Sequence, residues 1–202
     1  AVLYVNNDFG KGGQATIKGL LATGPTQIVT EISTESGQVD FSAAVIQARQ
    51  SGADALFAYT NEEESARLLR ELRKQGWNKP VIGETVLTSA KVVELAGEAA
   101  NGVVAHVGLT VEAPQLQAWG KKYLAEYKTV SDHNGVKGYT AVYVLKAAIE
   151  KSGRVDRKAA AAAIRNSCFS AKQHPGVLMD VCFDDKGDID RESFITEIRN
   201  GK

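Results

Sequence analysis

The chain has 202 residues, of which 44% are hydrophobic and 24% charged, and its 24 basic side chains balance 24 acidic ones. This length is enough for one or two domains with a buried core. The balanced and dispersed charge does not favour a nucleic-acid partner, because a phosphate-binding surface needs a basic stripe, and no apolar run approaches the length that spans a bilayer.

The first 110 residues are predicted to alternate strands and helices. Each expected strand is a short apolar run bounded by turn residues, and each connection has the length and the apolar periodicity of a helix. The expected strands cover residues 1–5, 28–32, 55–58, 80–83 and 102–109. Strands separated by helices predict an α/β fold with a doubly wound parallel sheet.

The helices between these strands are expected to turn their apolar residues towards the sheet. Asp40 is placed to cap the second of them, and a short fourth helix is expected over residues 89–95. The expected inward residues are Ile17, Leu20 and Leu21 in the first helix, Phe41, Val45 and Ala48 in the second, and Leu68, Leu69 and Leu72 in the third.

The third helix has clear start and stop signals. Thr60 with Glu63 three residues later forms a capping box, and Gly76 supplies the left-handed residue after the last turn. Residues 62–64, all glutamate, place negative charge at the positive end of the helix dipole and are expected to be solvated.

Two polar residues follow the strands on either side of this helix. Tyr59 comes at the end of one strand and Glu84 directly after the next. If these strands are parallel neighbours, their carboxyl ends meet at one edge of the sheet, where ligands collect in open α/β folds. The sequence therefore predicts a binding cleft floored by Tyr59 and Glu84.

A glycine-rich stretch after the first strand has two interpretations. Residues 10–15 match G-x-G-x-x-A, and Glu31 lies at the distance of a ribose-binding acid, so the alternative function is a nucleotide-dependent Rossmann-like α/β enzyme that uses the Gly10–Ala15 loop. The favoured interpretation is a flexible helix entry, because residues 6–9 separate the strand from the first glycine and Asp8 would face a pyrophosphate.

From Val111 onwards the sequence predicts consecutive helices. Pro114 suits a first turn, a second helix is expected over residues 137–151, and Asp156 is placed to cap a third. The expected core stripes are Leu116, Trp119, Tyr123, Leu124 and Tyr127 in the first helix and Val142, Leu145 and Ile149 in the second. These helices have no predicted sheet of their own, so they must pack on something else.

The C-terminal part is predicted to contain two strands, at residues 177–183 and 193–198, around a turn at residues 184–188. The Asp spacing of this turn does not fit a calcium loop. Cys168 and Cys182 pair in an oxidising environment or stay as free thiols in the cytosol, and the sequence leaves both open. No metal-ligand spacing or catalytic motif is found, so neither a cofactor nor an enzymatic activity is expected.

Five stretches that together cover essentially the whole chain carry a family resemblance. They are AVLYVNNDFGKGG, VDFSAAVIQARQSGADALFAYT, KPVIGET, GYTAVYVLKAAIEKSG and VCFDDKGDIDRESFITEIRNGK. In this order they resemble the second half of the branched-chain amino-acid-binding (Leu/Ile/Val-binding) family, the type I extracytoplasmic substrate-binding proteins of ABC importers.

The resemblance implies two α/β lobes around a hinge. Residues 1–109 would form the second lobe, residues 110–180 would be a mainly helical segment of the first lobe, and residues 181–202 would cross back to the second. A core strand at residue 1 would then mark a piece of a longer protein.

The resemblance also implies ligand contacts. Phe9 stands where an aromatic residue packs on the ligand side chain, and Tyr59 resembles the aromatic residue that ends the central strand. Glu84 resembles the acid that pairs with the ligand's α-ammonium group, with Thr60 and Thr85 beside these positions as further ligand-binding residues.

The implied ligand is an aliphatic or aromatic amino acid or a related carboxylate. The implied protein partner is the membrane permease of an ABC transporter, with no nucleic acid and no direct membrane insertion. The implied location is periplasmic or extracellular, although no signal peptide is visible in the sequence.

Overall fold

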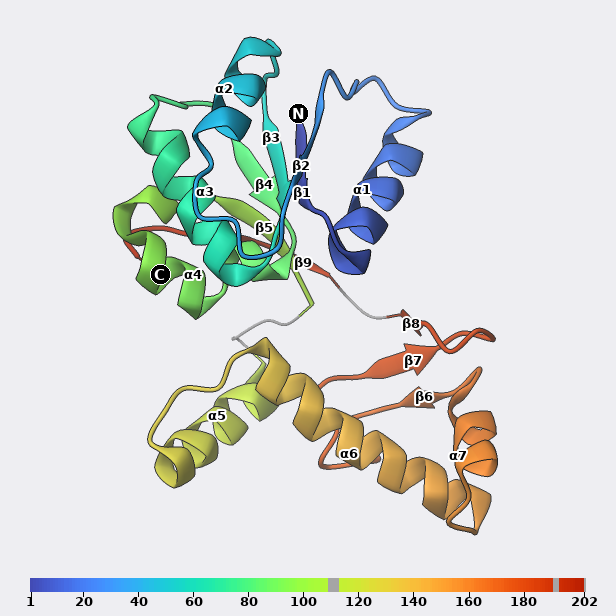
Figure 1. Cartoon of the computed structure of the whole chain (residues 1–202). Coiled ribbons are helices and arrows are strands. Elements are labelled where there is room, and N and C mark those ends of the chain that lie inside the picture. The colour runs from blue at the N-terminus through green and yellow to red at the C-terminus, as the bar shows by residue number, and fades with distance from the viewer. Residues whose placement is uncertain (109–112, 191–192, 202) are drawn as a thin grey trace. The chain divides into compact units, whose positions relative to one another are not determined.

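The computed structural model describes residues 1–108, 113–190 and 193–201. The chain divides into two compact units, one made of Ala1–Val107 with Ile195–Lys202 and the other of Gly108–Phe194 (Figure 1). The segment expected to cross back is therefore divided, since residues 181–194 belong to the second unit and residues 195–202 to the first.

The first unit is built on one sheet whose strands lie in an order different from their order in the sequence. Its strands are β1 (Val2–Val5), β2 (Glu31–Thr34), β3 (Leu56–Tyr59), β4 (Val81–Gly83), β5 (Val104–Val107) and β9 (Phe194–Glu197). They lie in the order β2-β1-β3-β4-β5-β9, and the pairs β1–β2, β1–β3, β3–β4 and β4–β5 are parallel. The predicted doubly wound parallel sheet is confirmed, although β2 begins at Glu31 instead of residue 28, and residue 109 of the expected fifth strand lies outside the described residues.

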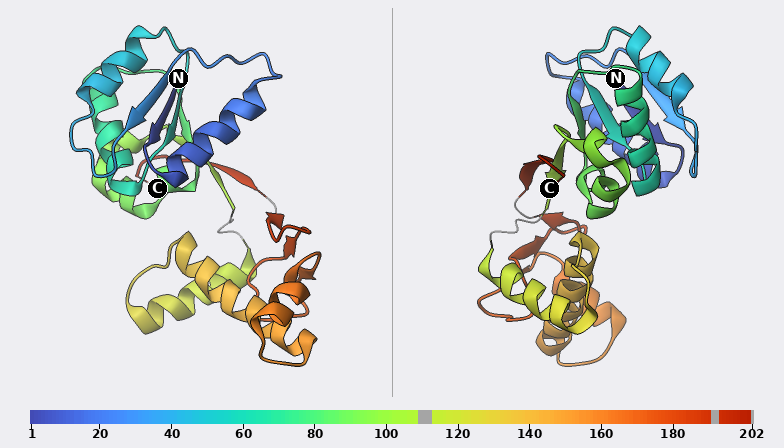
Figure 2. Two further views of the ribbon diagram at one scale, coloured as in Figure 1. Left: turned by 45° about the vertical axis from the view of Figure 1, so that its right-hand side comes forward. Right: turned by 90° about the vertical axis from the view of Figure 1, so that its left-hand side faces the viewer.

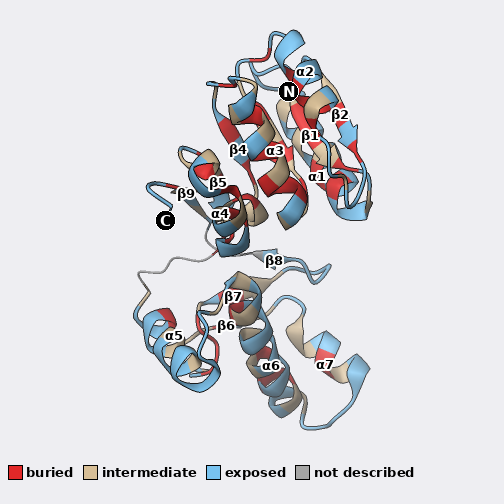
Figure 3. Ribbon diagram, turned by 60° about the vertical axis from the view of Figure 1, so that its left-hand side comes forward, coloured by how far each residue is buried: buried red, intermediate tan, exposed pale blue. Residues whose placement is uncertain are grey.

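Helices cover this sheet on both faces. They are α1 (Asp8–Leu21), α2 (Ser42–Gln50), α3 (Glu62–Lys74) and α4 (Ala90–Ala96), with 3₁₀ turns η1 (Thr85–Thr88) and η2 (Gly97–Ala100). Figures 1 and 2 show α1 on one face and α2, α3 and α4 on the other. In Figure 3 the buried residues are concentrated in the strands and in the helix sides that lie against them.

The core under α2 and α3 is the one that the periodicity predicts. Leu68, Leu69 and Leu72 of α3 are fully buried, and so are the inward residues that were expected in α2. Gly76 and Gly52 both have positive φ, as helix-ending glycines do. Burying apolar side chains of this size contributes about 1.5–3 kcal/mol each.

Helix α1 differs from its predicted packing. Leu20 is 69% exposed and Ile17 and Leu21 are half-buried, whereas Gly10 and Gly13 are buried. Figure 1 shows the C-terminal end of α1 directed away from the strands. The helix thus meets the sheet through the small residues of its first turns, and its last turn leaves Leu20 exposed.

The predicted capping box at α3 is wrong. The helix begins at Glu62 after Asn61, and the Thr60 side chain makes no bond to the helix backbone at N3. Glu63 is exposed and pairs with Arg67 one turn on, at 3.1 Å. Because the helix starts one residue later than expected, the inward face of its first turn falls on Glu64.

Glu64 is buried, so the expectation that all three first-turn glutamates are solvated is also wrong. Its Oε1 accepts hydrogen bonds from the Gly37 backbone N–H at 2.7 Å and from Asn61 Nδ2 at 3.0 Å. Burial pushes the pKa of Glu64 upwards, but these hydrogen bonds outweigh it, so the pKa lies below its ordinary value. Glu64 therefore ties the turn after β2 to the start of α3.

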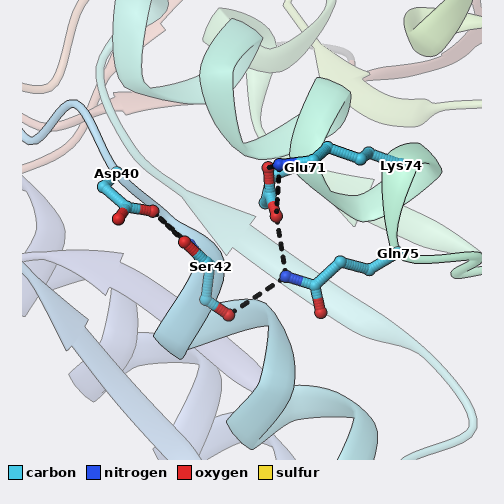
Figure 4. A network of polar contacts seen from close by, with 5 residues as sticks. All are labelled: Asp40, Ser42, Glu71, Lys74 and Gln75. Carbon is cyan, nitrogen blue, oxygen red and sulfur yellow. Dashed lines mark hydrogen bonds and ion pairs between the residues drawn. The ribbon is translucent and has the colours of Figure 1, made fainter.

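A polar network joins the start of α2 to the end of α3 (Figure 4). The Gln75 Nε2 group donates to the Ser42 carbonyl at 3.2 Å and to Glu71 Oε1 at 2.7 Å, and Lys74 pairs with Glu71 at 3.1 Å. The Asp40 carboxylate accepts from the Ser42 backbone N–H at 2.8 Å. The two helices are thus held together at their polar edge as well as by the core.

The second unit has a small sheet of its own, which the sequence did not predict. Its elements are α5 (Pro114–Tyr127), α6 (His133–Ser152), α7 (Arg157–Ile164), β6 (Cys168–Phe169), β7 (Val181–Phe183) and β8 (Ile189–Asp190). The strands pair antiparallel in the order β6-β7-β8. Strands of two or three residues are too short to leave an alternating pattern, which explains why β6 was missed and β7 was expected to be longer.

The predicted turn and helix cap in this unit are confirmed. Asp184 accepts from the backbone N–H groups of Lys186 and Asp188, at 2.9 and 2.8 Å, and closes the turn between β7 and β8. Asp156 caps α7 by accepting from the Ala159 N–H at 2.8 Å. Pro114 lies in the first turn of α5, as expected.

The core stripes expected in α5 and α6 are largely wrong. In α6, Val142 is 65% and Leu145 48% exposed, while the buried residues are Val136, Val144, Ala147 and Ala148. Val144 and Ala147 pack with Phe169, Val177 and Val181 from the strand region. The hairpin that the sequence did not predict therefore selects which face of α6 is buried.

In α5, only the first residue of the expected stripe is buried. Leu116 is in the core, whereas Leu124 is 46% and Tyr127 64% exposed. Trp119 lies between Tyr123 at 5.1 Å and Tyr139 at 5.4 Å, measured between ring centroids. The aromatic residues of α5 thus pack mainly on each other and on α6.

The two cysteines form a disulfide. Cys168 in β6 and Cys182 in β7 are direct partners across the strands. The sequence left this pairing open, because the hairpin that brings the residues together was not evident from it.

Candidate ligand-binding site

The carboxyl edge of the parallel sheet brings Tyr59 and Glu84 together. Strand β3 ends at Tyr59 and β4 at Gly83, and these parallel neighbours pair with Ala58 opposite Gly83. Tyr59 and Glu84 are thus adjacent positions at one edge. Both side chains are half-buried, so neither is sealed in the core.

Aromatic rings line this edge on the α1 side of the sheet. Phe9, in the first turn of α1, is 38% exposed, and its ring centroid lies 4.4 Å from that of Tyr59. Phe57, two residues before Tyr59 on the same face of β3, stacks on it at 6.2 Å. Asn7 fixes the start of α1 by accepting from the Gly10 N–H at 2.9 Å. The three rings form a continuous apolar wall.

Glu84 places a carboxylate beside this wall. One oxygen, Oε1, caps the turn η1 by accepting from the Val86 N–H at 2.9 Å. In the part of the chain that the structure describes, Glu84 has no ion-pair partner within 4.0 Å. Burial and then the negative charge of Glu84 raise the pKa of Tyr59, so the carboxylate and the phenol are within electrostatic reach.

The two threonines of the predicted site lie differently. Thr60 is buried, and its hydroxyl is 2.8 Å from the Ser65 hydroxyl, so it holds the end of β3 to the start of α3. Thr85 is half-buried, and its Oγ1 donates to the His106 carbonyl at 3.1 Å, which ties η1 to β5. The edge therefore presents Phe9, Tyr59 and Glu84, with Thr85 at its side and Thr60 beneath it.

The glycine-rich stretch is not a nucleotide loop. Helix α1 starts at Asp8, so residues 10–15 are already helical and leave no loop to surround a pyrophosphate. Glu31, the expected ribose-binding acid, is bonded to Gln14 and to Lys18 Nζ, the latter at 2.7 Å. The interpretation as a dinucleotide site is thus wrong, because Asn7 caps the helix three residues before the first glycine.

The same glycines have a packing role that sequence reasoning missed. A Cβ atom on Gly10 would lie 1.9 Å from the Val5 carbonyl oxygen, and a Cβ atom on Gly13 would lie 2.5 Å from the Tyr59 ring. Both positions require a residue without a side chain at a close approach. The signal in the sequence was the helical spacing of these residues. Gly10 follows Asn7 by three residues and Gly13 follows Phe9 by four, which places both glycines on the inner side of a helix.

The second unit holds an apolar groove that sequence reasoning also missed. It has a volume of about 400 Å³ and lies between α6 and the β7–β8 hairpin. Its apolar lining includes Val136, Val144, Leu145, Ile164, Met179 and Phe183. The available signal was that α6 has apolar residues on more than one side. The predicted orientation of that helix assigned the wrong side to the core, so the groove was not expected.

Comparisons with known proteins concern the family and the fold. A family model described as periplasmic binding protein matches residues 1–202. The leucine-, isoleucine-, valine-, threonine- and alanine-binding protein of Pseudomonas aeruginosa is 24% identical over 195 residues, which are 96% of this chain and 51% of that protein. The Leu/Ile/Val-binding protein BraC3 of Rhizobium johnstonii is 27% identical over 197 residues, 96% of this chain and 52% of that one.

Solved structures show the same fold. The leucine-binding protein LivK from Thermotoga maritima superimposes with a TM-score of 0.87 at 22% identity, covering 100% of this chain and 58% of that one. A solute-binding protein of an ABC transporter from R. palustris, in complex with benzoate, has a TM-score of 0.85 at 20% identity and is covered to 55%. The chain spans about half the length of the curated relatives it matches.

Proposed function

The chain belongs to the periplasmic binding protein family, and from this premise we propose that it serves an ABC importer as a solute-binding protein for a small amino acid or related carboxylate. The ligand is held without being transformed. One observation carries this proposal: the Glu84 carboxylate, which has no ion-pair partner among the described residues, stands beside the aromatic pair of Phe9 and Tyr59 at the carboxyl edge of a parallel sheet.

The charge of this edge favours a ligand that has an ammonium group. Solved relatives include both a leucine-binding protein and a protein that holds benzoate. The Glu84 carboxylate would attract an ammonium group and repel the carboxylate of benzoate, and in a half-buried site this difference is larger than in water. Among the two ligand classes, the amino acid is therefore the better match to this edge.

The aromatic wall suits the rest of such a ligand. Phe9 and Tyr59 offer ring faces and edges to an aliphatic or aromatic side chain, and ring surfaces of this kind also tolerate a nearby cation. Thr85 sits beside Glu84 and contributes to the floor, whereas Thr60 acts by holding β3 to α3. The proposed contacts are thus Phe9, Tyr59, Glu84 and Thr85.

The first unit supplies one lobe of the proposed binding protein, and the second unit belongs to the other lobe. The described residues of the second unit form small clusters of buried side chains and leave apolar residues of α6 exposed. Relatives carry about as much chain again as this one, enough for the sheet of another lobe. A ligand that binds the closed form more tightly than the open form then shifts the protein towards closure.

The family supports a proposed location and a proposed partner. Its members are periplasmic binding proteins, and the disulfide between Cys168 and Cys182 suits an oxidising compartment. No described helix is long and apolar enough to cross a membrane. The proposed protein partner is the permease of the importer.

Calorimetry with L-leucine and with benzoate tests the proposal on the protein of full natural length. Wild type is expected to bind leucine and not benzoate, and Glu84→Gln is expected to bind leucine at least about tenfold more weakly, because a charge-assisted contact is lost. Glu63→Gln, which removes an exposed acid of α3 that pairs with Arg67, is the matched control and should bind as wild type. Binding of leucine that is unaffected by Glu84→Gln would refute the role of this carboxylate.

A further inference from the structure

We propose that Gly13 is a positioning residue of the ligand site, because its missing side chain lets the Tyr59 ring lie directly on helix α1 and so fixes where the aromatic wall stands. The inference rests on the proposed function and extends it from the residues that face the ligand to one that sets their geometry. It also gives the glycine-rich stretch a role that replaces the nucleotide interpretation.

The close approach is seen in three ring atoms at once. A Cβ atom on Gly13 would lie 2.5 Å from Tyr59 Cζ and 2.6 Å from both Cδ2 and Cε1. Such distances lie below any ordinary contact, which begins at 3.4 Å. The ring therefore rests on the bare backbone of α1, with no room for even a methyl group.

Phe9 confines the Tyr59 ring from a second side. It precedes Gly13 by four residues, so both lie on the same face of α1, one turn apart. The Phe9 ring lies 4.4 Å from the Tyr59 ring at an interplanar angle of 42°. Tyr59 is thus held by Gly13 beneath it and by Phe9 at its side, and Phe57 stacks at 6.2 Å from the strand.

A comparison with the neighbouring glycines distinguishes an effect on the position of the Tyr59 ring from an effect on folding. At Gly10 the obstacle is the Val5 backbone carbonyl, 1.9 Å from the added Cβ, and backbone cannot move without disturbing β1. At Gly12 an added Cβ meets nothing within 4 Å. At Gly13 the obstacle is the far part of a side chain, so an alanine there displaces the Tyr59 ring more readily than it disrupts the fold.

A methyl group at Gly13 displaces the Tyr59 ring. To reach an ordinary contact, the Tyr59 ring must move from 2.5 Å to at least 3.4 Å from the new methyl group. It moves away from α1 and alters its contact with Phe9. Because burial and the charge of Glu84 both raise the pKa of Tyr59, a ring that is displaced from these surroundings has a changed pKa.

The test compares Gly13→Ala with Gly12→Ala in the protein of full natural length. Both replace a helical glycine of α1 by alanine and so gain the same helix propensity. Gly13→Ala is expected to weaken L-leucine binding by about threefold to tenfold, the worth of one aromatic contact, while Gly12→Ala binds as wild type. The ligand-free readout is the alkaline titration of Tyr59, followed by absorbance against Tyr59→Phe, and the pKa of Tyr59 should change in Gly13→Ala only.

Three outcomes are decisive. A changed Tyr59 titration together with weaker leucine binding supports the proposal. A changed titration when wild type itself binds no leucine still supports the positioning role, and it refutes the proposed ligand. An unchanged titration with unchanged binding overturns the positioning role, whatever the ligand.

A double-mutant cycle covers the case in which Gly13→Ala folds poorly. If Gly13 acts through the Tyr59 ring, the loss of stability caused by Gly13→Ala disappears in a Tyr59→Ala background, where the methyl group meets no ring. An equal loss in both backgrounds would overturn the proposal, because Gly13 would then act through contacts other than Tyr59.

Discussion

Glu64 offers a direct test of how the edge of the sheet is held. The residue is only 4% exposed, and its carboxylate accepts hydrogen bonds from the Gly37 N–H and the Asn61 side chain. Hydrogen bonds to a charged group contribute about 1.5–3 kcal/mol each. Because Glu64→Gln keeps a neutral acceptor and removes only the charge, we expect it to lower the free energy of unfolding by about 1–2 kcal/mol at pH 7.

The effect of Glu64 must depend on pH in a defined sense. Its folded-state pKa lies below the ordinary value of 4.5. Its stabilisation is therefore complete above pH 4.5 and is lost as the pH falls through the folded-state pKa. Urea unfolding of wild type and Glu64→Gln should show a stability difference at pH 7 that shrinks steadily below pH 4.5.

The neighbouring acid provides the control. Glu63 is 61% exposed in its side chain and pairs with Arg67 at 3.1 Å. An exposed pair of this spacing contributes about 0.3–0.5 kcal/mol, so Glu63→Gln should be nearly neutral. A difference for Glu64→Gln that is equal at pH 7 and pH 3, or no larger than that of Glu63→Gln, would refute the buried hydrogen-bonded carboxylate.

Three further predictions concern the site and the second unit. Glu84→Gln should lower the pKa of Tyr59, measured by absorbance, while burial keeps that pKa above 10.0. In wild type, the contribution of Tyr59 to stability is present below pH 10.0. It is lost as the pH rises through the raised pKa of Tyr59. Replacing Cys168 and Cys182 by serine should lower the unfolding free energy of the second unit by about 2–4 kcal/mol, and a melting temperature insensitive to a reductant would contradict this. Gly10→Ala should destabilise the first unit by more than about 2 kcal/mol in urea unfolding, because its Cβ meets the β1 backbone at 1.9 Å.

The proposed ligand class has a physical basis that sequence similarity alone does not provide. Relatives of about equal similarity bind branched-chain amino acids by name or hold benzoate in their crystals. We propose that the charge at the carboxyl edge of the sheet discriminates between the two ligand classes. In this chain that charge is the carboxylate of Glu84, which favours an ammonium group over a second carboxylate.

The sequence by itself determined the sheet and the edge of the proposed site. Apolar runs, helix periodicity and end glycines are local signals, so the strands, their parallel direction and the shared edge of Tyr59 and Glu84 followed from them. The family resemblance added Phe9, whose ring proved to contact Tyr59.

Only the tertiary structure decided how the side chains pack on these elements and which of them are buried. The close approach of Gly13 to Tyr59 and the burial of Glu64 depend on chain segments far apart in sequence, and so does the burial of one face of α6 by the strands of the second unit. A helix with apolar residues on several sides does not specify which side is covered, because that depends on which partner packs there. The short strands that pack on α6 have no recognisable sequence pattern, so their effect on the burial of α6 is evident only in the three-dimensional structure.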